Sequence, residues 1–133
     1  MFRAALCNRC HRAGLVGPAV GPDLTFVARR FGRRDLLQSI VTPSASVAEN
    51  YRNVEVVTED GRTYVGRMVA EGDFRSEKLL LSVDPLRSNA FVEVDKRQIV
   101  DSRTVPTSPM PQGLLDPFTL AEIRDLLAFL ESS

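Results

Sequence analysis

The chain has 133 residues, an apolar fraction of 44% and equal numbers of basic and acidic side chains, 17 of each. A net charge of zero gives no reason to expect binding to nucleic acid or to a membrane surface, and no apolar run reaches the length of a transmembrane helix. The length suits one domain, or a small domain with a second lobe inserted into it.

The first candidate functional feature is the motif Cys7-Asn8-Arg9-Cys10-His11. Two cysteines three positions apart, with a histidine directly after the second, are typical of covalent c-type haem attachment. In that arrangement the thiols add to the haem vinyl groups and the imidazole faces the iron. The sequence therefore predicts one haem c, attached through Cys7 and Cys10, with His11 as an iron ligand.

Two other uses of the cysteine pair are less favoured. A Cys-x-x-Cys pair is half of many structural zinc sites and His11 is a possible third ligand, but the chain has no further Cys or His to supply a fourth. A thioredoxin-like redox pair lies between a strand and a helix. Here residues 1–10 instead predict a short helix, with Phe2 and Leu6 on one face.

The segment before Cys7 is too short to be a secretory signal peptide. Because haem is attached to c-type proteins outside the cytoplasm, we expect a periplasmic or otherwise extracytoplasmic location, with the signal sequence in a longer precursor. Both cysteines are assigned to haem, so neither predicts a disulfide.

After the motif, residues 12–20 form a loop rich in Gly and Pro, which leads into Gly21-Pro22-Asp23-Leu24. A histidine ligand needs its other ring nitrogen held by an acceptor, which fixes the tautomer and the ring orientation. We assign this role to the carbonyl of Pro22. A plain turn is the alternative interpretation.

Residues 26–41 predict a helix that is broken at Gly32 and ended by Pro43. The helix carries a basic run, formed by Arg29, Arg30, Arg33 and Arg34. Such a run is most simply a solvated face. The alternatives are that one arginine pairs with a haem propionate, or that the run docks an acidic redox partner.

From Tyr51 the apolar spacing changes to the alternation of β-strands. The predicted strands lie around Val54 and Val56 and at residues 63–70, 78–83, 90–94 and 98–102. Together they predict a small antiparallel sheet or barrel, which we interpret as a β lobe inserted over residues 51–102. The lobe has no cluster of His, Cys or paired acids that would indicate chemistry of its own.

The last predicted element is a helix that begins after Thr119. Thr119 and Glu122 have the spacing of a capping box, and an apolar stripe follows. The stripe contains Leu120, Ile123, Leu126, Leu127 and Leu130. Phe129 is expected to contact Phe2 or Leu6 if the first and last helices cross.

In this order the motifs resemble those of class I c-type cytochromes, and most closely the haem-binding domain family of planctomycetes and verrucomicrobia. The family pattern is the haem motif, Gly-Pro-Asp-Leu-Thr, a Leu-Leu helix closing in Pro-Ser, a β-rich stretch that opens with Tyr, and Met-Pro-x-Gly-Leu. Here these are residues 7–11, 21–25, 36–44, the stretch from Tyr51, and 110–114. The segment before Cys7 is shorter than in class I cytochromes.

The resemblance implies a mainly α cytochrome c-like fold with an inserted small antiparallel β-sheet or barrel, α+β overall. Residues 1–50 and 103–133 would form the haem-binding frame and residues 51–102 the inserted lobe. Removing those 52 residues leaves 81, the size of a short cytochrome c.

The resemblance also implies that Met110 is the second iron ligand. A thioether favours ferrous iron and raises the reduction potential relative to a second histidine, which this chain does not have. Pro109 and Pro111 restrict the backbone on both sides of Met110. Met68 lies in a strand pattern, and Met1 is terminal.

We therefore predict a monohaem c-type cytochrome module that transfers single electrons and is not itself an enzyme. Its partner would be a redox protein or a fused dehydrogenase domain. One alternative is a haem-based sensor or peroxidase-like site with a labile distal ligand. In another, the β lobe binds a protein or polysaccharide and the haem acts as a relay.

Overall fold

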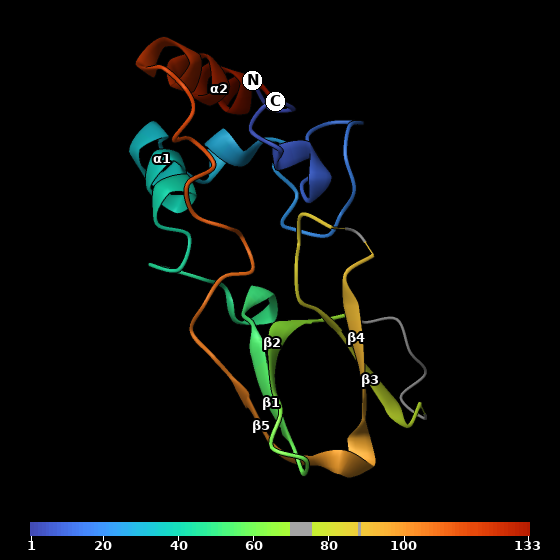
Figure 1. Ribbon diagram of the computed structural model, residues 1–133. Helices are drawn as coiled ribbons and strands as arrows, with labels where there is room; N and C mark the ends of the chain where they lie inside the picture. Colours follow the sequence, from blue (N-terminus) through green and yellow to red (C-terminus); the bar gives the residue numbers. More distant parts are fainter. Residues whose placement is uncertain (70–75, 88) are drawn as a thin grey trace. The chain divides into compact units, whose positions relative to one another are not determined.

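The computed structural model describes residues 1–69, 76–87 and 89–133. The chain divides into two compact units. The first combines Met1–Ser46 with Pro111–Ser133, and the second is Val47–Met110 (Figure 1).

Both α-helices belong to the first unit. Helix α1 spans Arg33–Val41 and helix α2 spans Leu120–Ser132. Helix α2 begins with the predicted capping box. Thr119 Oγ1 accepts a hydrogen bond from the backbone N–H of Glu122 at 3.3 Å. In return, Glu122 Oε2 accepts a hydrogen bond from the backbone N–H of Thr119 at 2.8 Å. The capped start predicted for this helix is therefore confirmed.

Gly32 is the N-cap of helix α1, so the break predicted at this glycine is confirmed. Before the break the chain forms only a short 3₁₀ turn, η2, at Val27–Arg29, rather than part of an α-helix. Phe26, which precedes this turn, has a left-handed backbone with φ of 55°. An L-residue rarely adopts that conformation, and it cannot continue an α-helix.

The α-helix predicted over residues 1–10 is wrong. Turns lead into a 3₁₀ helix, η1, at Cys7–Arg9, and Leu6 before it has a left-handed φ of 59°. So short a segment cannot offset the cost of nucleating an α-helix. The predicted aromatic contact is nevertheless confirmed, because the ring centroids of Phe2 and Phe129 lie 5.2 Å apart.

The core of the first unit is apolar and draws on both of its chain segments. Its buried members include Phe2, Ala5, Val27, Leu36, Ile40, Leu115, Leu126, Leu127 and Leu130. Of the stripe predicted on helix α2, Leu126 is fully buried, whereas Leu120 at the helix start is 74% exposed.

This difference predicts unequal costs for two matched substitutions on helix α2. Leu126→Ala should lower the free energy of unfolding by about 2–5 kcal/mol, because it opens a cavity in the core. Leu120→Ala should change it by less than about 0.5 kcal/mol, since the side chain contacts mainly solvent. Urea unfolding of both variants measures the two free-energy losses, and equal values would contradict the difference in burial between Leu126 and Leu120.

The second unit is built on a five-stranded antiparallel sheet with strand order β4-β3-β2-β1-β5. The strands are β1 (Val54–Thr58), β2 (Thr63–Met68), β3 (Lys78–Ser82), β4 (Phe91–Asp95) and β5 (Ile99–Thr104). Short 3₁₀ turns, η3 and η4, lie at Glu49–Tyr51 and Lys96–Gln98. The strand predictions are confirmed, except that Ala70 lies outside the described residues.

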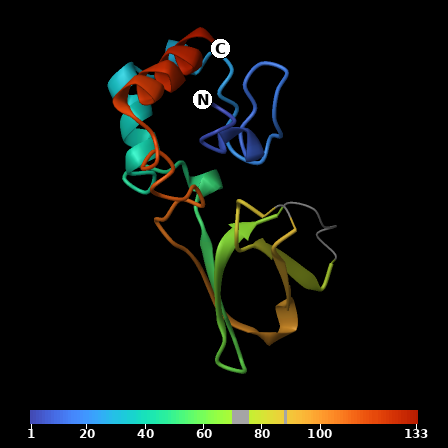
Figure 2. The same ribbon diagram turned by 45° about the horizontal axis from the view of Figure 1, so that its top comes forward.

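The sheet is strongly curved (Figure 2), and its buried face is formed by Val54, Val56, Leu81 and Val94. Gly66 lies where β2 changes partner, from β1 to β3. A Cβ at Gly66 would be only 2.5 Å from the carbonyl oxygen of Ser82. The glycine thus allows the close approach of strands at this bend.

The fold class predicted from the resemblance is wrong, because the protein is not mainly α. The described residues contain two α-helices and four short 3₁₀ turns, which together make 27% of those residues helical, beside the five-stranded sheet. The predicted frame loses helix because the left-handed backbones of Leu6 and Phe26 interrupt the two segments predicted as helical, which form turns instead. No helix in the described part of the chain is long and apolar enough to span a membrane.

Candidate functional site

The Cys-x-x-Cys-His motif folds as one closed turn. The carbonyl of Cys7 accepts hydrogen bonds from the backbone N–H groups of both Cys10 (3.2 Å) and His11 (2.9 Å). Cys7 is buried, with 8% of its surface exposed, and Cys10 is partly buried. The two cysteines are not joined in a disulfide. Burial raises the pKa of the Cys7 thiol, which therefore stays protonated at neutral pH.

The imidazole of His11 contacts the carbonyl of Pro22, as predicted from the sequence. The distance from His11 Nδ1 to the carbonyl oxygen of Pro22 is 2.7 Å. A carbonyl can only accept a hydrogen bond, so Nδ1 carries the hydrogen and Nε2 keeps its lone pair. Burial lowers the pKa of His11, although the bond to Pro22 opposes this, and the ring is neutral at neutral pH.

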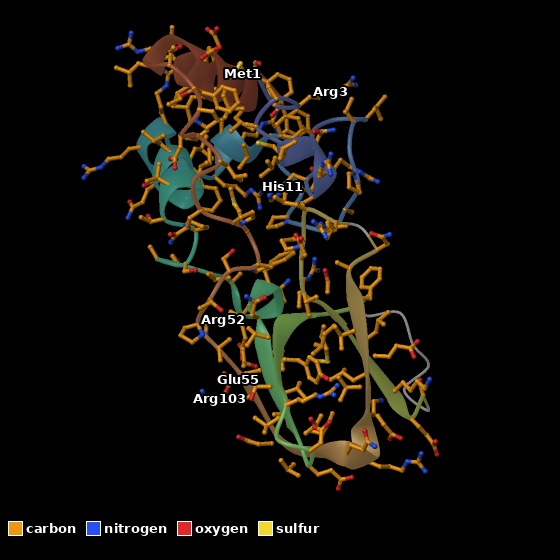
Figure 3. All side chains as sticks on the ribbon, viewed as in Figure 1. Met1, Arg3, His11, Arg52, Glu55 and Arg103 are labelled. Atoms are coloured by element: carbon orange, nitrogen blue, oxygen red, sulfur yellow. The ribbon has the colours of Figure 1, made fainter. Side chains whose placement is uncertain are left out.

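Two glycines let the loop backbone close around His11, which is labelled in Figure 3. A Cβ at Gly21 would lie 2.8 Å from Cε1 and 2.9 Å from Nδ1 of the ring. A Cβ at Gly17, where φ is +98°, would lie 2.1 Å from the His11 carbonyl oxygen. Any other residue at these positions would displace His11 or the loop.

The segment 21–25 is tied to the motif and to the residues that follow it. Backbone N–H groups of Gly21 and Leu24 donate to the carbonyls of Cys10 (2.7 Å) and Arg12 (2.8 Å). The Gly14 N–H donates to Thr25 Oγ1 at 2.8 Å. Sequence reasoning singled out only Pro22 here and missed the contacts of the other members. The Gly-Pro-Asp-Leu-Thr motif was the signal that could have drawn attention to them.

The contact between Gly21 and the imidazole predicts a steric effect on the site. Gly21→Ala should lower the free energy of unfolding by about 1–3 kcal/mol, as overpacking does elsewhere, and should break the hydrogen bond from His11 Nδ1 to Pro22. Urea unfolding measures the first effect, and imidazole ¹⁵N chemical shifts report the tautomer.

Gly32→Ala is the matched control for this substitution. A Cβ at Gly32 would meet Asp35 Oδ2 at 3.5 Å, an ordinary contact, and φ there is −75°. We expect this variant to lose no more than about 1 kcal/mol, through weaker capping of helix α1, and to keep the His11 tautomer. A Gly21→Ala variant with wild-type ¹⁵N shifts would show that the backbone at Gly21 does not constrain the ring.

Met110 is the last residue of the second compact unit, Val47–Met110. It is partly buried, and its backbone N–H donates to Ser108 Oγ at 3.1 Å. The structure therefore brings Cys7, Cys10, His11 and Pro22 together within the first unit. The assignment of Met110 as an iron ligand stays a prediction.

The residues of the site suit haem better than a bare metal ion. Within residues 1–69, 76–87 and 89–133 there is no group of three or more His, Cys, Asp or Glu side chains placed to hold a metal. Haem brings the four porphyrin nitrogens to its iron, so the protein needs to add only axial ligands, and the two thiols can form its thioether links. Pro22 holds His11 Nδ1, and Gly21 lies against the ring, so Nε2 would be free to bind a haem iron.

Apolar side chains on the loop also fit a large apolar cofactor. Leu15 is fully exposed, and Val16 and Val20 are 44% and 45% exposed. All three lie on the loop between His11 and Pro22, the two residues joined by the contact of Nδ1 with the carbonyl oxygen. The residues present thus fit a covalently attached haem.

No family model matches this sequence, and no match is found among curated proteins.

Proposed function

We propose that the chain is a monohaem c-type electron-transfer module, in which Cys7 and Cys10 attach the haem and His11 binds its iron. The observation that carries this proposal is the 2.7 Å contact between His11 Nδ1 and the Pro22 carbonyl, next to two thiols on the same turn. The contact leaves Nε2 unprotonated, which is the state that metal coordination requires.

Bound haem supplies reversible one-electron Fe(II)/Fe(III) chemistry. The protein would hold the histidine ligand in the correct tautomer and orientation. Pro22 fixes the tautomer of His11 and orients the ring, and partial burial keeps the imidazole neutral. Gly17 and Gly21 allow the loop to close on His11.

The same proposal includes Met110 as the second axial ligand, because it is the one soft donor in a Pro-flanked loop and the chain has no second histidine. With both axial positions filled, the module would carry electrons rather than catalyse a reaction. We propose an extracytoplasmic location, where haem attachment occurs, and a redox protein or fused dehydrogenase domain as partner.

The direct test is to express the chain together with c-type haem maturation machinery. We expect a reduced absorption spectrum with c-type bands and a polypeptide mass increased by one haem. The same chain expressed without the machinery is the control and should lack both. A protein that folds in the presence of the machinery but shows no c-type bands would refute the proposal.

Carbon monoxide separates an electron carrier from a haem sensor or a peroxidase-like site. A six-coordinate ferrous protein should bind carbon monoxide slowly, because the distal ligand must first leave. Rapid, near-stoichiometric binding would instead support a labile distal position. Stopped-flow mixing of the reduced protein with carbon monoxide makes this distinction.

A further inference from the structure

Basic side chains are concentrated in the part of the chain that contains the candidate haem site. Although the whole chain has no net charge, residues 1–34 contain one acidic residue, Asp23. The same segment contains Arg3, Arg9, Arg12, Arg29, Arg30, Arg33 and Arg34. The first unit therefore has a strongly basic segment around its ligand histidine.

Three of these arginines gather around residues 23–26. The Arg30 guanidinium donates to the carbonyl oxygen of Asp23 at 3.2 Å. The Arg29 guanidinium lies 4.4 Å from the centre of the Phe26 ring. Hydrogen bonds from Thr25 lower the pKa of Asp23, and the charges of Arg12 and Arg30 lower it further, so both charges act on this carboxylate.

The three arginines carry three positive charges near one carboxylate, that of Asp23. Among the described residues, ion pairs include Arg33 with Glu131, but none joins Arg12, Arg29 or Arg30 to a carboxylate. All three are exposed to solvent. They are therefore available to an acidic partner.

Two exposed aromatic rings accompany these charges. Phe26 is 54% exposed and Phe31 is 46% exposed, and the Arg30 guanidinium lies 5.8 Å from the Phe31 ring. A solvated basic face has no need of exposed phenylalanines. Arginine and aromatic side chains are instead the residues enriched where proteins bind one another.

The backbone holds Phe26 in a strained, exposed position. Its φ is +55°, and its N–H donates to the Ser133 carbonyl at 2.8 Å. Strain of this kind persists only where the surrounding structure enforces it, and it occurs often at functional sites.

We propose that Arg12, Phe26, Arg29, Arg30 and Phe31 form a docking surface for an acidic protein redox partner. The inference rests on the proposed electron-transfer function and names the chemistry of the partner. The surface is connected to the iron ligand along the chain, because Arg12 follows His11 and its carbonyl accepts from Leu24, two residues after Pro22. Complementary charge at such a surface speeds encounter and excludes partners of the wrong sign.

The test uses the haem-loaded protein and two small oxidants of opposite charge. Ferricyanide, an anion, and tris(phenanthroline)cobalt(III), a cation, each take one electron from the ferrous protein and become ferrocyanide and the cobalt(II) complex. If the surface is where electrons leave, the ferricyanide rate should fall as salt is added and the cobalt rate should rise.

The triple variant Arg12→Gln, Arg29→Gln, Arg30→Gln should slow ferricyanide by on the order of tenfold at low salt. It should equal the wild type at about 1 M salt, where the Debye length is about 3 Å. The matched control is Arg62→Gln, Arg87→Gln, Lys96→Gln, which removes the same charge from exposed positions of the second unit. It should have a much smaller effect.

Two further variants keep the test decisive if the triple variant does not fold. Arg29→Gln alone should slow ferricyanide about two- to threefold at low salt, and Arg29→Lys should not. Equal effects of the triple variant and its control would overturn the proposal. So would a changed reduction potential with an unchanged salt dependence, because that would place the arginines against a haem propionate.

A second measurement does not need haem. The apo chain should bind polyaspartate at low salt, and the triple variant should bind about tenfold more weakly than the control. If no haem is incorporated, the electron-transfer proposal fails, and polyaspartate binding still decides whether the basic surface selects acidic partners. Equal polyaspartate binding by the triple variant and the control would refute the surface itself.

Discussion

Replacing both Cys7 and Cys10 with alanine is expected to abolish covalent haem attachment. In the proposed module each thiol would supply one thioether link, and no other cysteine exists in the chain to replace it. After expression with the maturation machinery, the double variant should have the mass of the bare polypeptide, and acidified organic solvent should remove any haem that remains.

Single variants provide the controls for this experiment. Cys10→Ala should keep haem attached through Cys7 alone, and Cys7→Ala should keep it attached through Cys10 alone. Because Cys7 is buried, its loss should also cost on the order of 1 kcal/mol of stability, whereas Cys10 is partly buried and should cost less. Haem that resists extraction from the double variant would refute the assignment of the cysteines.

Replacing Met110 is expected to produce the second large effect. Met110→Ala should open the distal position of the iron, so that the ferrous protein binds carbon monoxide rapidly. Met110→His should keep six-coordination but lower the reduction potential by on the order of 0.1 V or more, within the range of about 0.8 V that axial ligands span. Optical redox titration and stopped-flow mixing measure the two results.

Met68→Ala is the matched control for Met110. Met68 is in the same compact unit, on strand β2, and is 51% exposed. We expect its removal to leave the potential and the carbon monoxide kinetics unchanged. If Met110→Ala also leaves both unchanged, Met110 does not bind the iron.

The features that sequence reasoning predicted well depend on residues close together in the chain. The capping box joins Thr119 to Glu122, three residues apart, and the break before helix α1 needs only Gly32. Strands are visible for a similar reason, because the alternation around Val54 and Val56 is itself the pattern of a half-buried strand.

The fold class was missed because helix formation in the first unit depends on more than apolar spacing. Phe2 and Leu6 have helical spacing, yet Leu6 adopts a left-handed backbone, and the chain turns into the Cys-x-x-Cys-His motif instead of continuing as a helix. The compact core supplied by helix α2, where Leu126 is fully buried, outweighs these local strains. The spacing of apolar residues in the sequence does not show that core burial will offset backbone strain elsewhere.

The residues of the candidate site can be identified from the sequence alone, because two thiols and one imidazole within five residues are a property of composition and spacing. The tertiary structure decided how the imidazole is presented. Pro22, eleven residues after His11, holds Nδ1, and Gly17 and Gly21 make room for the ring and its carbonyl. These contacts join residues that meet only when the loop closes, so the balance of steric fit and hydrogen bonding in the folded unit determines them.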